Sequence, residues 1–379
     1  MKINEVAPIF ERINSTGRRL TIYDLMRAAT WSGTFDLNNI VKQIKESLEQ
    51  KQFDKILETH ILRSISASAG YGINKADIEN LRDLQNPQQR NKLQEAANAC
   101  IEAYQLAVDF LTNELPVASQ SYLPYALQLT YLAEFFRIQP KATFQQRETL
   151  KTWMWHTSLS GYFRSANTGQ NISDLQKIRN FANGKINELN IDKPINFKKF
   201  VNDDFSLNKA TSKTFALLLS SQKPKSLLDG SLINTRQALA TANRHEYHHI
   251  FPQAYLKSRG FSQEKIDNHS NICLLNKGNN ITISNQQPSI YFKEMANKLE
   301  DNMESILASN FIDIKTHEAA LQDDYETFLQ LRSNTLINAA KLLSNYQINT
   351  NDNGTDETAD TPDYYAEDEV NDEIEEEDY

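Results

Sequence analysis

Apolar residues at helical spacing across residues 90–115 constrain the fold of this chain more than any other feature. They recur every three or four positions, which places them along one face of a long α-helix. The members of this stripe are Leu93, Ala96, Ala97, Cys100, Ile101, Tyr104, Ala107, Phe110 and Leu111. Pro116 ends the pattern. Only 11 Gly and 10 Pro occur in 379 residues, so helices are favoured over a strand-and-turn architecture.

Similar patterns predict most of the remaining elements as helices. We expect helices over 38–65, 122–138, 145–162, 173–187, 213–220, 233–241, 290–307 and 315–345. Thr21 with Asp24 has the spacing of a capping box and predicts the start of an earlier helix. Residues 189–212 are polar and irregular, so we expect a domain boundary there. The predicted fold is therefore mainly α, with a small α+β part near residues 244–290, where short apolar runs suit a hairpin followed by a helix.

The two cysteines, Cys100 and Cys273, form no CxxC pair. A disulfide framework is therefore not expected, and a reducing compartment fits. Residues 1–10 lack a basic region followed by an apolar run, and no stretch approaches 18 uninterrupted apolar residues. We therefore predict a cytoplasmic protein with no membrane partner.

The net charge of −9 conceals a basic body. Residues 351–379 hold 14 Asp or Glu and no Lys or Arg, which leaves 40 basic and 35 acidic residues, a net charge of +5, over residues 1–350. A mildly basic body is compatible with nucleic acid as a partner. The acidic tail has the composition of a disordered segment. Either it keeps the protein in solution, or it mimics DNA and competes for the basic surface, in which case its deletion tightens DNA binding.

Four of the seven histidines fall between residues 245 and 269, and His248 and His249 are adjacent. Hydrolysis of a phosphodiester needs a base with a pKa near neutrality beside the attacking water. It also needs positive charge for the leaving oxygen and the phosphate, which a divalent cation supplies. Adjacent residues of a strand point to opposite faces, so one histidine of the pair can serve a metal and the other a water.

The segments that carry this chemistry resemble the HNH nuclease domain of the ββα-metal superfamily. The matching runs are Glu-Tyr-His-His-Ile-Phe-Pro at 246–252, Asn-Ile-Cys-Leu-Leu at 271–275 and Asn-Ile-Thr-Ile-Ser at 280–284, with Pro288 after them. They look most like the domain fused at the C-terminus of GmrSD-type restriction enzymes, which act on modified DNA. The resemblance implies a helical N-terminal domain followed by a small ββα-metal module with flanking helices.

The resemblance also implies a role for each residue of the site. His248 would bind the metal, and His249 would be the general base. Asn271 would orient the base by bonding backbone near it, and Asn280 would be the last metal ligand, although the neighbouring Asn279 competes for that role. Many family members have Asp where His248 stands, so Mg²⁺ and Mn²⁺ both stay open as cofactors.

A second stretch, residues 10–20, looks like a late motif of the family's ParB/sulfiredoxin-like domain, which binds NTP. Arg12, Asn14 and Gly17 would then belong to a composite nucleotide pocket, or else form a capped helix end with an exposed arginine. The family's earlier Asp-Gly-Gln-Gln-Arg motif does not precede Phe10. Either an upstream-encoded subunit supplies the missing NTP-binding segment, as in split members of the family, or the chain is a truncated relative.

These expectations divide the chain into four segments. Residues 1–37 would be a remnant of the NTP-binding domain, 38–200 a helical domain, 201–345 the nuclease domain and 346–379 a disordered acidic tail. The predicted function is a metal-dependent DNA endonuclease that restricts modified phage DNA. The alternative is a non-catalytic or partner-dependent nucleotide-binding subunit of a split restriction complex.

Two other interpretations concern the remaining histidines. His245 and His269 are expected to contact phosphate or to lie on the surface. A zinc site built from His245, His248 and Cys273 is an alternative, but it lacks a fourth ligand and leaves His249 without a role.

Overall fold

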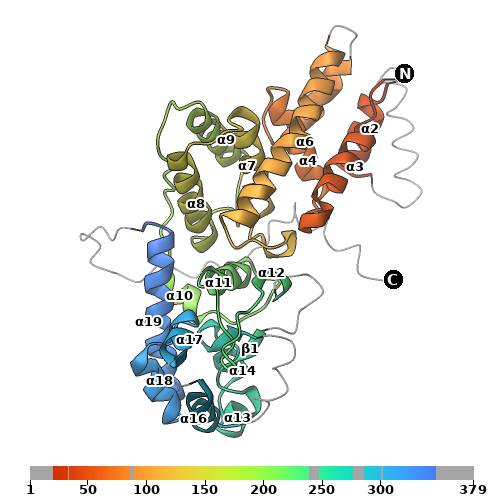
Figure 1. Cartoon of the computed structure of the whole chain (residues 1–379). Helices are drawn as coiled ribbons and strands as arrows, with labels where there is room; N and C mark the ends of the chain where they lie inside the picture. The colour runs from red at the N-terminus through yellow and green to blue at the C-terminus, as the bar shows by residue number, and fades with distance from the viewer. Residues whose placement is uncertain are drawn as a thin grey trace.

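The computed structural model describes residues 20–32, 34–85, 89–238, 247–275, 286–299 and 302–346. Within these ranges the protein is mainly helical, with one two-stranded antiparallel sheet, which agrees with the predicted fold class. Helices α2 to α9 gather in the upper part of Figure 1, and the helices from α10 onward gather with the sheet in the lower part. None of the described helices is both long enough and apolar enough to cross a membrane.

The first group of helices packs around α6 and α7. Its members are α2 (Ile22–Thr30), α3 (Leu37–Leu48), α4 (Glu58–Ser68), α5 (Lys75–Glu79), α6 (Arg90–Asn113), α7 (Ala126–Ile138), α8 (Phe144–Leu159) and α9 (Thr168–Ala182), with short 3-10 turns η1 (Glu49–Lys51), η2 (Asn80–Gln85) and η3 (Gln120–Tyr122). The long helix predicted over 90–115 is confirmed as α6. The predicted capping box is also confirmed, because Thr21 and Asp24 bond each other's backbone N–H at the start of α2.

The prediction of one helix over residues 38–65 is wrong. The chain leaves α3 at Leu48, makes a 3-10 turn, and starts α4 only at Glu58. Gln52 adopts a left-handed conformation with φ of 60°, which no α-helix accommodates. The break lets Phe53 turn into the interior, where its side chain has no exposed surface. Burial of that ring, which is a tertiary gain, outweighs the local helical pattern.

The second group of elements holds the sheet. Its members are α10 (Phe197–Asn202), α11 (Ala210–Ser221), α12 (Thr235–Ala238), β1 (Tyr247–His249), α13 (Gln253–Ser258), α14 (Gln263–Ile266), η4 (His269–Asn271), β2 (Ile272–Leu274), α16 (Pro288–Leu299), α17 (Met303–Ser309), α18 (Ile314–Leu321) and α19 (Tyr325–Leu343). The helix predicted over 315–345 is two helices, because Asp323 has a φ of 54° and ends α18 before α19 begins. The helix predicted over 290–307 corresponds to α16 and α17, on either side of residues 300–301, which lie outside the described residues.

The segment predicted to be irregular, 189–212, contains α10. Phe197, Phe200 and Val201 are buried there in the core of the first group of helices. The predicted limit between residues 200 and 201 therefore falls inside a helix. The division into four segments stays a prediction, and the tail beyond residue 346 lies outside the described residues.

Strand β2 joins the two hydrophobic cores of the molecule. Side chains alternate along a strand, and β2 is buried on both faces. Ile272 and Leu274 pack into the N-terminal core, the cluster dominated by α3 to α11. Cys273 and the following Leu275 pack into the C-terminal core, the cluster of α13, α16, α18 and α19. Strand β2 is thus held from both sides, and this fixes the position of β1, to which it is connected through α13, α14 and η4.

Candidate functional site

The histidine pair lies on β1, one of the two strands of the small sheet. The register places His248 opposite Cys273 and His249 opposite Ile272. The two imidazoles therefore leave opposite faces of the strand, as the sequence predicts. All three residues of β1 are partly exposed, although Nε2 of His248 is itself buried.

His249 makes a hydrogen bond with a carboxylate that the sequence analysis did not identify. Its Nε2 lies 2.8 Å from Oδ1 of Asp267, and the two side chains are 25% and 29% exposed. Gln263 donates to the other carboxylate oxygen at 2.7 Å. An ionised carboxylate only accepts hydrogen bonds, so Nε2 carries the proton of a neutral His249 ring. The other ring nitrogen, Nδ1, then has a lone pair that can accept a proton.

Asn271 lies fully buried between the elements that carry His249 and Asp267. Its Oδ1 accepts from the backbone N–H of Phe251 at 2.8 Å, and its Nδ2 donates to the carbonyls of Phe251 and Ile266 at 3.1 and 3.0 Å. Phe251 follows His249 by two residues, and Ile266 directly precedes Asp267. One carboxamide therefore ties together the two backbone segments from which the imidazole and the carboxylate project.

Two further side chains, absent from the sequence-based prediction, hold the same backbone. Tyr291 on α16 donates its hydroxyl to the carbonyl of Ile250 at 2.8 Å. Arg332 on α19 donates to the carbonyls of Ser270 and Ile272 at 2.7 and 2.8 Å and also to Asn310. Arg332 has no exposed surface. The carbonyls on both sides of Asn271 are thus bonded to a buried guanidinium, which stiffens the turn into β2.

The prediction that His269 contacts phosphate or lies on the surface is wrong. Its ring is fully buried, stacks on Phe215 with centroids 4.5 Å apart, and bonds Ser212 and the carbonyl of Phe200 through its two nitrogens. Burial lowers the pKa of His269 to about 4. It is a neutral structural residue that joins η4 to α10 and α11.

Several predicted site residues lie outside the described part of the chain. Arg12, Asn14 and Gly17 of the nucleotide pocket are among them, as are His245, Asn279 and Asn280. The composite NTP pocket and the subunit expected to complete it therefore stay predictions. Over the described ranges, no group of three or more His, Cys, Asp or Glu side chains is arranged to hold a metal ion.

The structure disfavours Cys273 as a zinc ligand. Its side chain is buried in the C-terminal core. Burial raises the pKa of the Cys273 thiol to about 12, whereas a zinc ligand must be the thiolate.

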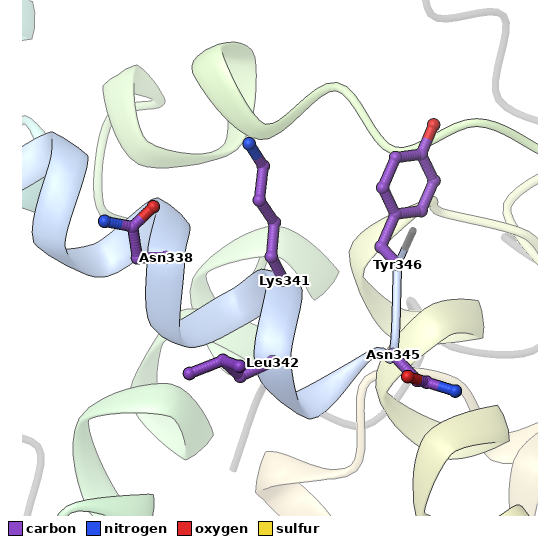
Figure 2. A pocket seen from close by; sticks show the side chains of 5 residues that line it. All are labelled: Asn338, Lys341, Leu342, Asn345 and Tyr346. Atoms are coloured by element: carbon purple, nitrogen blue, oxygen red, sulfur yellow. The ribbon is translucent and has the colours of Figure 1, made fainter. Parts of the chain in front are cut away.

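A hollow of about 440 Å³ lies elsewhere, along the last turns of α19. Its lining residues are Asn338, Lys341, Leu342, Asn345 and Tyr346, and Figure 2 shows Lys341 and Tyr346 pointing to the same side of the helix. Both approach the ring of Phe197, at 5.6 Å for the ammonium and 5.3 Å between ring centroids. The residues that line it include no carboxylate and no imidazole. The histidine pair on β1 is therefore the better candidate for a catalytic site.

Comparisons with known proteins give the chain one distant relative and no family. No protein-family profile matches it. The uncharacterized protein MJ0686 of Methanocaldococcus jannaschii is 22% identical to this chain over an alignment 377 residues long. The alignment covers 89% of this chain and 61% of the relative. The chain therefore spans about three-fifths of the length of that relative.

Proposed function

We propose that this chain is a metal-dependent DNA endonuclease that hydrolyses phosphodiester bonds. The observation that carries the proposal is the contact of 2.8 Å between His249 Nε2 and Asp267 Oδ1. The main chain next to both residues is bonded by the buried side chain of Asn271. A partly exposed imidazole with one nitrogen in a hydrogen bond and the other able to accept a proton is suited to act as a base toward water. The resemblance to HNH nucleases supports the same assignment for His249.

In the proposed reaction, Nδ1 of His249 accepts a proton from a water as that water attacks the phosphorus in line with the departing 3′ oxygen. Asp267 holds the ring through Nε2, and Asn271 holds the backbone after β1. The departing 3′ oxygen takes a proton from solvent, and His249 returns its own proton to solvent, so the products carry a 5′-phosphate and a 3′-hydroxyl. Cleavage of this kind needs the attacking water and the base within hydrogen-bond reach of each other. A base on a strand whose main chain is held in place favours this arrangement.

In the proposed site, two protein ligands would hold a divalent ion that keeps most of its water ligands. His248 leaves the face of β1 opposite to His249 and is partly exposed, and Asn280, outside the described residues, would complete the pair of protein ligands. Few protein ligands and several waters suit Mg²⁺, and Mn²⁺ also accepts an imidazole. Such an ion would stabilise the negative charge of the phosphate and of the departing oxygen.

DNA as the substrate is supported by charge. Residues 1–350 carry a net charge of +5, and Lys257 and Arg259 are exposed in the segment between β1 and β2. Lysine and arginine side chains bind phosphates and make DNA affinity fall steeply with salt. Restriction of modified phage DNA follows from the family resemblance alone, so the test uses modified DNA as one of its substrates.

The experiment compares cleavage by the wild-type chain and His249→Ala. Supercoiled plasmid and phage DNA carrying hydroxymethylated or glucosylated cytosine are incubated with Mg²⁺ or Mn²⁺, and with EDTA as the blank. Loss of the base is expected to lower the rate about 10²–10⁴-fold. His156→Gln is the control, because His156 lies on α8, outside the β1–β2 pair, and its imidazole bonds the backbone carbonyl of Lys193. Equal cleavage by wild type and His249→Ala would remove the assignment of the base, and absence of metal-dependent cleavage by the wild type would remove the function.

A further inference from the structure

We propose that Asp267 is a positioning residue, which selects the tautomer of His249 in which Nδ1 is free of its proton. The inference rests on the proposed function and deepens it, since it identifies the group that makes one ring nitrogen basic. It starts from the contact of 2.8 Å between His249 Nε2 and Asp267 Oδ1. A neutral imidazole in water exchanges its proton between two nitrogens, and only one of these tautomers offers a given nitrogen as acceptor.

Besides the contact with His249, Asp267 makes three hydrogen bonds, one through its carboxylate and two through its main chain. Gln263 donates to its Oδ2 at 2.7 Å. The backbone N–H of Phe205 donates to its carbonyl at 2.8 Å, and its own N–H donates to the carbonyl of Gln263 at 2.8 Å. A mobile carboxylate on a surface contributes little to the orientation of its partner. One whose backbone and second oxygen are both bonded can hold an imidazole in one orientation.

The buried surroundings keep the distance between the two groups constant. Asp267 ends α14 at the residue after Ile266, and Ile266 has no exposed surface. The carboxamide of Asn271 bonds the carbonyl of Ile266 as well as Phe251. Because the same side chain holds both backbone segments, the imidazole and the carboxylate move as one unit. A catalytic group and its support must be held within a fraction of an ångström to work together.

The sequence separates Asp267 from His249 by 18 positions, and only the path through α13 and α14 brings them together. Asp267 is 29% exposed, so its carboxylate is not needed to fill the core. A carboxylate beside a histidine at this distance has two possible roles: orientation of the ring, or a surface ion pair without consequence for the reaction. The two roles predict different results when the carboxylate is removed.

The first measurement reads the tautomer directly and does not depend on activity. Nitrogen-15 NMR of the histidine rings distinguishes a protonated from an unprotonated ring nitrogen, and the signals of His249 are assigned by their absence in His249→Gln. Spectra are recorded at a pH where the ring is neutral. In the wild type we expect Nε2 to carry the proton. In Asp267→Ala we expect both tautomers, and in Asp267→Asn an amide that can donate to Nε2 and so favours the opposite one. An unchanged tautomer in both variants would overturn the inference.

The second measurement is cleavage of the same DNA substrates. We expect Asp267→Ala and Asp267→Asn to lower kcat about 10–10³-fold, with KM changed less than about threefold. We expect Asp267→Glu, which keeps the acceptor, to restore part of the rate. Glu264→Gln is the control, since Glu264 is exposed on the same short helix. A full rate for Asp267→Ala, with an unchanged thermal midpoint, would make the contact a plain ion pair.

The two proposals fail separately. If His249→Ala cleaves DNA as well as the wild type, the base assignment is wrong whatever the tautomer shows. If His249→Ala is inactive while Asp267→Ala keeps both its rate and its tautomer, the nuclease function stands and the positioning role of Asp267 falls.

Discussion

At the scale of single residues, Asn271 gives the clearest example of a polar side chain that stabilises a site from the interior. It has no exposed surface and makes three hydrogen bonds to main-chain groups. Asn271→Ala would leave these groups buried without partners, and each unsatisfied group costs about 1–3 kcal/mol. We predict a loss of about 2–4 kcal/mol in the free energy of unfolding, measured by urea denaturation.

A control separates this effect from the ordinary cost of changing an asparagine. Asn297 lies on the exposed side of α16, and Asn297→Ala should change the free energy of unfolding by less than about 0.5 kcal/mol. If Asn271→Ala unfolds at the same urea concentration as the wild type, the three buried bonds do not contribute as argued.

Single residues also show which parts of the site the sequence could not predict. The histidine pair and Asn271 could be singled out from the sequence because they stand in order within 25 residues. Asp267 and His269 stand in the same short stretch, yet sequence alone does not show that Asp267 meets His249 or that distant residues cover His269. His269 is buried by Phe200 and Phe215, more than fifty positions away. No local pattern distinguishes a histidine that tertiary contacts will bury from one that will face water.

At the scale of elements, α19 stabilises η4 and the start of β2 through one buried charge. Arg332 donates to the carbonyls of Ser270, Ile272 and Asn310 and lies wholly in the interior. Arg332→Met keeps an unbranched, flexible side chain, although a shorter one, and removes every donor. We predict a loss of about 3–5 kcal/mol in the free energy of unfolding, because three buried carbonyls lose their partner at once.

Arg332→Lys should recover part of that loss, since one ammonium reaches fewer of the three carbonyls. Arg82→Met is the matched control: the side chain of Arg82 is 43% exposed and its ion pair with Asp83 is long, at 3.9 Å. That control should shift stability by less than about 0.5 kcal/mol. Similar midpoints for Arg332→Met and Arg82→Met in a thermal melt would contradict the role given to Arg332.

Elements also mark the limit of periodicity as a predictor. The long helix α6 follows its apolar stripe closely, but two predicted helices are each broken in two. Gln52 and Asp323 adopt left-handed φ at the breaks. Gln52 gives no warning by its type, whereas Asp323 belongs to a residue type that tolerates the left-handed region and occurs in turns. In both places the break allows large side chains to turn inward, and that gain depends on neighbours that are distant in sequence.

At the scale of the whole molecule, buried histidines make stability depend on pH. Burial lowers the pKa of His60 to about 3 and that of His269 to about 4, and the pKa of His317 shifts in the same direction. In the unfolded chain the same side chains have a pKa of about 6.5. Between pH 6.5 and 4 the unfolded state therefore binds protons that the folded state does not. The resulting stability is complete above pH 6.5 and is lost as the pH falls.

We predict that the free energy of unfolding falls by about 1.4 kcal/mol for each of His60 and His269 between pH 7.5 and pH 5.5, a window above the range where most carboxylates titrate. Urea denaturation at these two pH values gives the difference. His269→Gln should lower stability at both, because its bonds to Ser212 and Phe200 change, but the difference between the two pH values should shrink by about 1.4 kcal/mol. His60→Gln should shrink it by a similar amount. A variant that loses as much stability on acidification as the wild type would show that the substituted ring already binds its proton in the folded protein.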